Sequence, residues 1–334
     1  MTWGFAFEIT DAGWRAAQPG PHDSSTPDLV DAAASGRFTA GVHTADDVNE
    51  VWRGLPTEED IAFYETHGWW VSPRLFSEDQ IDRALDAANH FYQAPDHDLP
   101  AQAVFSNWKP ADGLDVTRNN EFVSLQSNGL REFACSARIG AIAARLARVD
   151  EIRLLDDQLV YKPPGVGAAT TVGWHADHAY WGTCSSDRLL TAWIPFHDID
   201  ENRGTLCLLD GSHRWPDIDH ARFFNDTDLV VRRADLAPGR EVVEVPVQLR
   251  KGQASFHHGW TLHASYPNRS TQFRLALAVH LQDGANHYRA FHRPDGQAVH
   301  IADELLCRTL PNGDPDFADP AVFPMLWPAG QPAR

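Results

Sequence analysis

Residues 151–164 read EIRLLDDQLVYKPP. Upstream of this stretch the apolar residues recur at a spacing of roughly 3.6, which is typical of helices, whereas from this stretch onward they alternate. The short β-rich runs that follow are separated by Gly, Pro, Asn and Asp, the residues that favour turns. The stretch therefore marks the position where a helical segment gives way to β-structure.

The β-rich part of the chain contains six short runs that predict strands. A helical segment followed by six or more strands with turn signals is typical of helices packed on an antiparallel sandwich or barrel. We therefore predict a mainly β fold with flanking helices. The expected strands cover Arg153–Tyr161, Leu189–Pro195, Thr205–Leu209, Val242–Leu249, Gln253–His257 and Phe273–Leu281.

Three helices are expected before residue 151. The first begins after Thr57, where Thr57-x-x-Asp60 supplies an N-cap and an acidic first turn, and it ends at Gly68. The second follows the capping box Ser77-x-x-Gln80. Apolar residues at helical spacing mark the last two helices; they are Ile81, Ala84, Leu85, Ala88 and Phe91 in one, and Ile139, Ile142, Leu146 and Val149 in the other.

Composition divides the chain into three parts. Residues 1–55 are rich in Gly, Pro, Asp and Ala and have only short apolar patches, so we expect a loosely structured N-terminal extension there. The main domain is expected over residues 56–290, with a long insertion at 212–240. Residues 291–334 are expected to form a C-terminal extension. The sequence shows no internal repeat and no low-complexity tract.

The net charge of the chain argues against some classes of binding partner. The 334 residues include 28 Lys and Arg against 46 Asp and Glu, which gives a net charge of −18. Nucleic-acid binding needs a basic surface, so this balance argues against a nucleic-acid partner, and it also disfavours anionic membranes. We therefore expect a small-molecule substrate, neutral or cationic rather than an acyl-CoA thioester.

Cysteine usage and the apolar runs point to an intracellular protein. The four cysteines lie far apart and include no Cys-x-x-Cys pair, so a zinc ribbon or a disulfide scaffold is not expected. The N-terminus has no basic segment followed by an apolar one, and no apolar run approaches the roughly 18 residues of a membrane span. We expect a cytoplasmic location and no membrane partner.

A His-x-Asp motif stands out among the 17 histidines. It lies in residues 173–177 (GWHAD), after a Pro- and Gly-rich loop. On an extended segment, residues i and i+2 project to the same side, so His175 and Asp177 can bind one cation. The best candidate for a third ligand is His263, at the end of a later strand. Two imidazoles and one carboxylate form the facial triad of non-haem Fe(II) sites, although His-x-Asp alone also arises by chance.

Arg274 lies 11 residues after His263. On a strand it shares one face with Ala276 and Ala278, and the two alanines leave space beside the guanidinium. An arginine that points into a barrel without a partner is costly, so a bound carboxylate explains it well. A buried Arg–Asp pair is the structural alternative.

These residues, together with the segments around them, resemble the phytanoyl-CoA dioxygenase family of Fe(II)- and 2-oxoglutarate-dependent oxygenases. The resemblance covers roughly residues 57–285, and the order of the motifs makes it specific. The matching segments are 57–68 (TEEDIAFYETHG), 157–165 (DQLVYKPPG), 174–177 (WHAD), 190–194 (LTAWI), 202–206 (NRGTL), 210–214 (DGSHR) and 263–274 (HASYPNRSTQFR).

The resemblance implies a double-stranded β-helix, or jelly roll, with an N-terminal helical layer, which agrees with the strands expected above. It implies that His175, Asp177 and His263 bind Fe(II). It also implies that Arg274 anchors the C5 carboxylate of 2-oxoglutarate, the cosubstrate. The implied reaction consumes dioxygen and oxidises a C–H bond by hydroxylation, or by a variant such as ring closure, desaturation or epoxidation.

Four further residues are expected around the cosubstrate. Ser265 and Gln158 correspond to residues that line it, and Trp181 and Trp193 are expected to form walls. The sequence departs from the family at Asp210, where a proline usually precedes Gly-Ser-His. That position is a turn, so we expect the departure to leave the chemistry unchanged.

Two other functions compete with the oxygenase. A cupin-like isomerase, or a non-catalytic binder with a jelly-roll fold, explains the metal ligands but not Arg274 at its spacing after His263. A halogenase of the same fold needs an open position where the carboxylate ligand sits, and Asp177 fills that position. We therefore favour the oxygenase, acting on a natural-product, amino-acid or aminosugar intermediate.

The remaining histidines are expected to be structural. His257 and His258 precede the proposed site on the same strand region, so a contact with the substrate is the alternative for them. His178, His213 and His280 are expected in turns or in the core. The segments that would select the substrate contain no readable motif, and the sequence does not indicate the oligomeric state.

Overall fold

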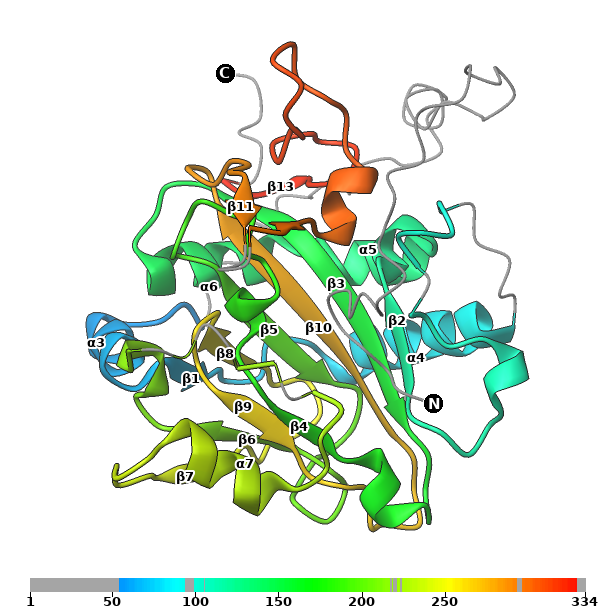
Figure 1. The fold of residues 1–334 in the computed structure, drawn as a ribbon. Helices are drawn as coiled ribbons and strands as arrows, with labels where there is room; N and C mark the ends of the chain where they lie inside the picture. Colours follow the sequence, from blue (N-terminus) through cyan, green and yellow to red (C-terminus); the bar gives the residue numbers. More distant parts are fainter. Residues whose placement is uncertain are drawn as a thin grey trace.

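Two β-sheets face each other in the protein, and helices cover the outer face of the larger one (Figure 1). Every strand pairing is antiparallel, so the predicted mainly β class with flanking helices is confirmed. Of the expected extension 1–55, only the last two residues lie within the part described. The computed structural model describes residues 54–93, 99–104, 106–216, 218, 221–222, 224–292 and 296–328.

The larger sheet has seven strands in the order β1-β8-β5-β10-β3-β13, with β2 also paired to β3. Its two longest strands, β3 and β10, run side by side through the centre of the molecule (Figure 1). The strands are β1 (Trp69–Val71), β2 (Arg118–Glu121), β3 (Ile152–Lys162), β5 (Leu190–Pro195), β8 (Ser255–His258), β10 (Arg274–Asp283) and β13 (Met325–Trp327).

The smaller sheet has four strands in the order β4-β9-β6-β7. A separate two-stranded ribbon joins β11 (Phe291–His292) to β12 (Ala298–Val299). The strands of the smaller sheet are β4 (Val172–His175), β6 (Leu206–Leu209), β7 (Glu244–Pro246) and β9 (His263–Ser265).

A capping box and a glycine set the two ends of the first helix. Thr57 and Asp60 form the capping box at the start of the first helix, and Gly68 ends that helix in the left-handed conformation, with φ 79°. A Cβ at Gly68 would lie 2.3 Å from Nδ1 of His213, so only glycine fits. The helices are α3 (Glu58–His67), α4 (Glu78–Gln93), α5 (Asn128–Ala134), α6 (Ala137–Ala147) and α7 (Leu229–Leu236).

Alternation along β10 separates the core from the space between the sheets. One set of its side chains packs against α4, α5 and α6 in the main hydrophobic core. The other set faces the smaller sheet and lines a cavity there. The core set is Leu275, Leu277, Val279 and Leu281. The cavity set is Arg274, Ala278 and His280.

Five of the six expected strands form at nearly the expected positions, as β3, β5, β6, β8 and β10. The run Val242–Leu249 was predicted too long, because only Glu244–Pro246 pairs with a neighbour. The sequence did not predict β1, β2, β4, β9 or β13, which have three or four residues each. Runs this short carry few residues to show a period, so some strands of this length were predicted, such as β6 and β8, and others were missed.

The C-terminal residues complete the fold. The strand β13 pairs with β3, and Phe317 and Phe323 join a second hydrophobic cluster that also contains Trp181. The expected C-terminal extension therefore packs on the main domain over much of its length. Within the described ranges, no helix has the length and apolar character that a bilayer crossing requires.

Candidate metal centre

The structure brings His175, Asp177 and His263 together between the two sheets. His175 is the last residue of β4 and His263 the first of β9, and the two lie directly opposite each other in the ladder. Their ring centroids are 4.1 Å apart. Ala176 is extended, with φ −113° and ψ 131°, so Asp177 projects to the same side as His175. His263 was expected at the end of a strand, whereas it begins one.

The ligand atoms of these three residues converge. Nε2 of His175 lies 3.6 Å from Oδ1 of Asp177, and Nε2 of His263 lies 3.4 Å from the same oxygen. All three ligand atoms lie within 4.8 Å of one another. The three residues are 5–7 % exposed.

The histidine rings are fixed in the orientation that a metal requires. Nδ1 of His175 donates to the carbonyl of Gly173 at 2.9 Å, and Nδ1 of His263 donates to the carbonyl of Thr261 at 3.0 Å. A carbonyl oxygen only accepts, so the proton is on Nδ1, and Nε2 presents its lone pair to the centre. Burial lowers the pKa of His175, and it lowers the pKa of His263 further, so both rings are neutral near pH 7.

Asp177 is held as a carboxylate. The Thr191 hydroxyl donates to Oδ2 of Asp177 at 2.5 Å, and Nε2 of His257 donates to the same oxygen at 3.1 Å. Burial raises the pKa of Asp177, but the nearby His263 and the hydrogen bond from His257 outweigh burial and hold this pKa well below its usual value. The donors bind Oδ2, which leaves Oδ1 directed at the two histidines.

This donor set fits a divalent first-row metal ion such as Fe(II). Two neutral imidazoles and one carboxylate form the arrangement of a facial triad, which leaves the other coordination positions of the metal open. All three side chains are buried, and each is held in place by a further hydrogen bond. Among the described residues, no other group of three or more His, Cys, Asp or Glu side chains is close enough to share an ion.

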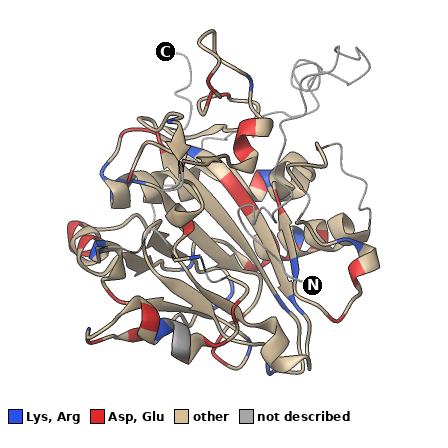
Figure 2. Cartoon of the chain, viewed as in Figure 1, with Lys and Arg blue, Asp and Glu red and all other residues tan. Residues whose placement is uncertain are grey.

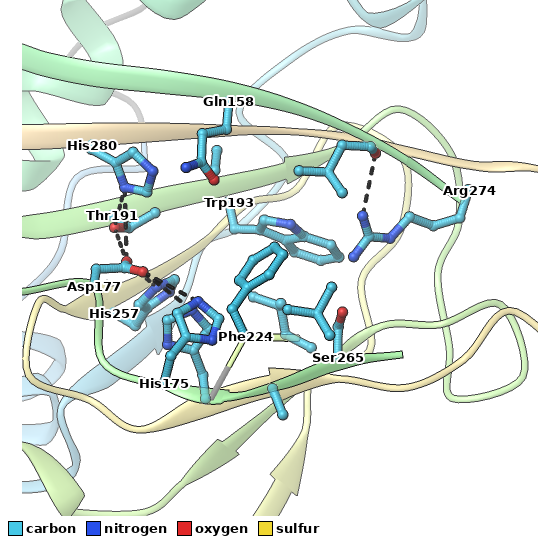
Figure 3. A pocket seen from close by; sticks show the side chains of 16 residues that line it. Gln158, His175, Asp177, Thr191, Trp193, Phe224, His257, Ser265, Arg274 and His280 are labelled. Carbon is cyan, nitrogen blue, oxygen red and sulfur yellow. Dashed lines mark hydrogen bonds and ion pairs between the residues drawn. The ribbon is translucent and has the colours of Figure 1, made fainter. Parts of the chain in front are cut away.

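Arg274 lies at the other end of the same cavity (Figure 3). It is 1 % exposed, and it donates to the carbonyls of Gly204 and Val160, each at 3.3 Å. Its guanidinium lies 5.3 Å from the ring of Trp193. Burial lowers the pKa of Arg274 to about 9. In the part of the chain that the structure describes, it forms no ion pair, so a carboxylate in the cavity would compensate its charge.

A second buried cation lies beside Arg274. Lys162 is opposite Arg274 in the ladder, and its Nζ donates to Oγ of Ser265 at 2.6 Å and to the carbonyl of Tyr266 at 2.7 Å. Burial lowers the pKa of Lys162 well below its usual value, and the charge of Arg274 lowers it further. Protein oxygens therefore bind the amino group of Lys162, and Arg274 is the basic residue that lines this end of the cavity.

The other predicted contact residues occupy different positions. Gln158, Trp193 and Ser265 line the cavity. Trp181 does not line it, but its ring lies 5.0 Å from the ring of His280, which does. Figure 3 shows Trp193 between the metal-ligand end and Arg274, with Gln158 above the histidines.

Three residues around Asp177 were not assigned to the site from sequence. His257 and His280 were expected to be structural, yet both line the cavity, and Nδ1 of His280 donates to Oγ1 of Thr191 at 2.8 Å. His280 carried a signal, because it continues the alternation of Arg274, Ala276 and Ala278. Thr191 carried none, since its role depends on pairing between β5 and β10.

The Thr191→Val variant is expected to weaken metal binding by about 10–100-fold, the usual effect of losing an outer partner of a ligand. Valine keeps the volume but removes the hydroxyl that orients Asp177. Titration with Co(II), a redox-stable substitute, measures the affinity. Thr183→Val is the matched control, because the Thr183 hydroxyl is buried and has no hydrogen-bond partner in the described part. Equal affinity in the two variants would contradict this role.

Comparisons with known proteins identify the family of the chain. The sequence profile of the family described as Phytanoyl-CoA dioxygenase (PhyH) matches residues 64–276, which is more than half of the chain. The peroxisomal phytanoyl-CoA dioxygenase of Rattus norvegicus is 28 % identical over 233 residues, covering 66 % of this chain and 67 % of the rat protein. The match to the Bos taurus enzyme, 28 % identical over 140 residues, covers 41 % of each. The chain thus spans about two fifths of the bovine relative.

Solved structures show the same fold. The non-heme alpha-ketoglutarate-dependent carbocyclase SnoK from nogalamycin biosynthesis superposes with a TM-score of 0.63 at 24 % identity, covering 86 % of this chain and 99 % of SnoK. The epimerase SnoN, solved with Fe3+, alpha-ketoglutarate and a nogalamycin compound, gives 0.59 at 25 % identity, covering 80 % of this chain and 98 % of SnoN.

Proposed function

Because the chain belongs to the phytanoyl-CoA dioxygenase family and is an Fe(II)- and 2-oxoglutarate-dependent dioxygenase, we propose that it oxidises a C–H bond of a small neutral or cationic metabolite. The products we propose are those of hydroxylation or of a related oxidation such as ring closure or desaturation. His175, Asp177 and His263 would hold Fe(II), and Arg274 would bind the C5 carboxylate of 2-oxoglutarate.

One observation carries this proposal. A single cavity has three convergent metal-ligand atoms at one end and a fully buried arginine at the other. Apolar side chains such as Trp193 and Phe224 line the cavity together with a few convergent polar groups, which is typical of small-molecule sites. A metal-binding protein of another class, such as a cupin-like isomerase, does not require a buried guanidinium in the same cavity as its metal ligands.

The chain's own residues would position the reactants. Bound iron with 2-oxoglutarate and dioxygen supplies the oxidising power, and succinate and carbon dioxide are the coproducts. Thr191 and His257 keep Asp177 ionised and oriented. Trp193 lies against Arg274, and the apolar side chain of Phe224 lines the cavity, so both would exclude water from it.

The small-metabolite proposal has two supports. The net charge of −18 disfavours polyanionic substrates over neutral or cationic ones. SnoK belongs to nogalamycin biosynthesis and SnoN has been solved with a nogalamycin compound, so a natural-product intermediate is the class we propose for this chain too.

A metabolite screen with succinate as the readout tests the function. We expect formation of succinate from 2-oxoglutarate that requires Fe(II) and dioxygen, rises when the substrate is present and stops when a chelator removes the metal. Omission of each component in turn is the control. Metal binding without any succinate formation across the screen would favour the cupin-like or non-catalytic alternative.

A further inference from the structure

Three carboxyl groups lie together beside the cavity, outside the metal centre. They belong to Glu121 on β2, Asp156 on β3 and Asp303 on the 3-10 turn η6 (Ala302–Leu305). Their exposed fractions are 8 %, 6 % and 4 %. Figure 2 shows acidic segments on the central strands below the turn η6, which is itself acidic.

Strand register places two of these residues next to cavity-lining residues. Glu121 is opposite Gln158, and Asp156 is opposite His280. Directly opposite residues project to the same face of a sheet, and both Gln158 and His280 line the cavity. Nε2 of Gln158 also donates to Oε1 of Glu121 at 3.4 Å. The acidic cluster therefore continues the wall of the cavity.

Asn119 extends this wall along β2. It is two residues from Glu121 and opposite Val160, which lines the cavity. Arg118, the residue before Asn119, projects from the opposite face of β2. Its guanidinium lies over the rings of Trp108 and Tyr161. Asn119 and Glu121 therefore share the cavity side.

Some of the polar atoms on this side lack partners. Both amide atoms of Asn119 and Oδ1 of Asp303 are buried and have no hydrogen bond with any described residue. Asn119 is 5 % exposed. Within the described ranges, Glu121, Asp156 and Asp303 form no ion pair with Lys or Arg. Buried polar groups are usually satisfied, so atoms left open beside a cavity indicate a missing ligand.

The charges of the cluster are also unbalanced. Burial raises the pKa of Glu121 to about 8 and that of Asp303 to about 7. Burial raises the pKa of Asp156 well above its usual value, and the nearby Asp303 and Glu121 raise it further. A bound cation would relieve this repulsion and let the carboxyl groups ionise.

We propose that Glu121, Asp156 and Asp303 bind an organic cation of the substrate, an ammonium or guanidinium group, with Asn119 binding a polar group next to it. This inference deepens the proposed function and rests on it. An organic cation fits better than a second metal ion, since the three carboxylates do not come close enough to share one ion. Asp156 is opposite His280, and Nδ1 of His280 lies 3.8 Å from Oδ2 of Asp177, so a cation bound by the cluster would lie at the metal-ligand end of the cavity.

Ligand-observed NMR on the full chain, loaded with diamagnetic Zn(II) and 2-oxoglutarate, tests the proposal. The probes are cyclohexylammonium, butylammonium and methylguanidinium, with cyclohexanol as the neutral counterpart of the first. We expect at least one cation to bind, and cyclohexanol to bind about tenfold more weakly than cyclohexylammonium or not at all. Glu121→Gln and Asp303→Asn should each weaken the binding of the cation by about tenfold, the effect of losing one charged hydrogen bond.

Asp115→Asn is the control, because it removes the same charge from an exposed position close to β2. The binding of 2-oxoglutarate to the Zn(II)-loaded protein is measured in parallel. Normal binding of 2-oxoglutarate without binding of any cation overturns the acidic site and leaves the proposed function intact. Equal binding of the cation by the wild type and both variants overturns it as well. Loss of 2-oxoglutarate binding in the wild type contradicts the proposed function itself.

The pH dependence of stability tests whether the carboxyl groups of the cluster have raised pKa values. The pKa values of Glu121 and Asp303 are higher in the folded protein than their unfolded values of about 4, so the folded state binds more protons between about pH 4 and pH 8. Stability due to these groups is present below that window and falls as pH rises through it. We therefore expect Asp303→Asn to raise Tm relative to the wild type more at about pH 8 than at about pH 5. An equal loss of Tm at both pH values would indicate a structural carboxyl group instead.

Discussion

The His263→Ala variant is expected to lose Fe(II) binding and to form no detectable succinate. Among the described residues, His263 belongs to the one group of three whose ligand atoms converge, and its Nε2 lies 3.4 Å from Oδ1 of Asp177. Loss of a residue that hydrogen-bonds to a metal ligand already lowers metal affinity or activity by about 10–100-fold. Loss of a ligand itself should lower them further. Anaerobic titration with Fe(II) measures binding, and succinate formation measures turnover.

His213→Ala is the control for this variant. His213 lies on the 3-10 turn η5 (Ser212–Arg214), where its Nε2 contacts the carbonyl of Glu65. It does not line the cavity. The control variant should bind Fe(II) as the wild type does.

Full activity in His263→Ala would mean that another residue is the third ligand. The structure offers one replacement, because Nε2 of His257 lies 3.1 Å from Oδ2 of Asp177 and its ring centroid is 4.4 Å from that of His263. In that case His257→Ala should abolish metal binding. If His257 only orients Asp177, its replacement should weaken binding without abolishing it.

The sequence predicted the ligand candidates because their pattern is local. His175 and Asp177 are two residues apart, and Arg274 follows His263 by 11 residues on a strand whose alternation is evident. The fold class was predictable for a similar reason, since the period changes at residue 151. Signals of this kind need no knowledge of which strands pair.

The residues around the ligands could not be predicted in the same way. Thr191 reaches Asp177 because β5 pairs with β10 and lies beside β8, so that His257 and His280 surround the same carboxylate. Glu121 lies next to the cavity-lining Gln158 because it is on β2, a strand of four residues that pairs with β3. Contacts of this kind depend on register between distant segments, which a single sequence does not specify.

The Arg274→Lys variant is expected to raise the KM for 2-oxoglutarate, and Arg274→Ala should raise it further. Lysine keeps a positive charge but loses the planar fork that binds a carboxylate through two hydrogen bonds. A charged hydrogen bond contributes about 1.5–3 kcal/mol, so we expect KM to rise by about 10–100-fold in Arg274→Lys. Initial rates of succinate formation at varied 2-oxoglutarate concentration measure this effect.

Metal binding separates loss of the cosubstrate contact from loss of the fold. Arg274 lies at the far end of the cavity from the three ligands (Figure 3), so both variants should bind Co(II) as the wild type does. Arg203→Lys is a matched control, because Arg203 donates to the carbonyl of Phe273 and does not line the cavity. An unchanged KM in both Arg274 variants would remove 2-oxoglutarate from this end of the cavity.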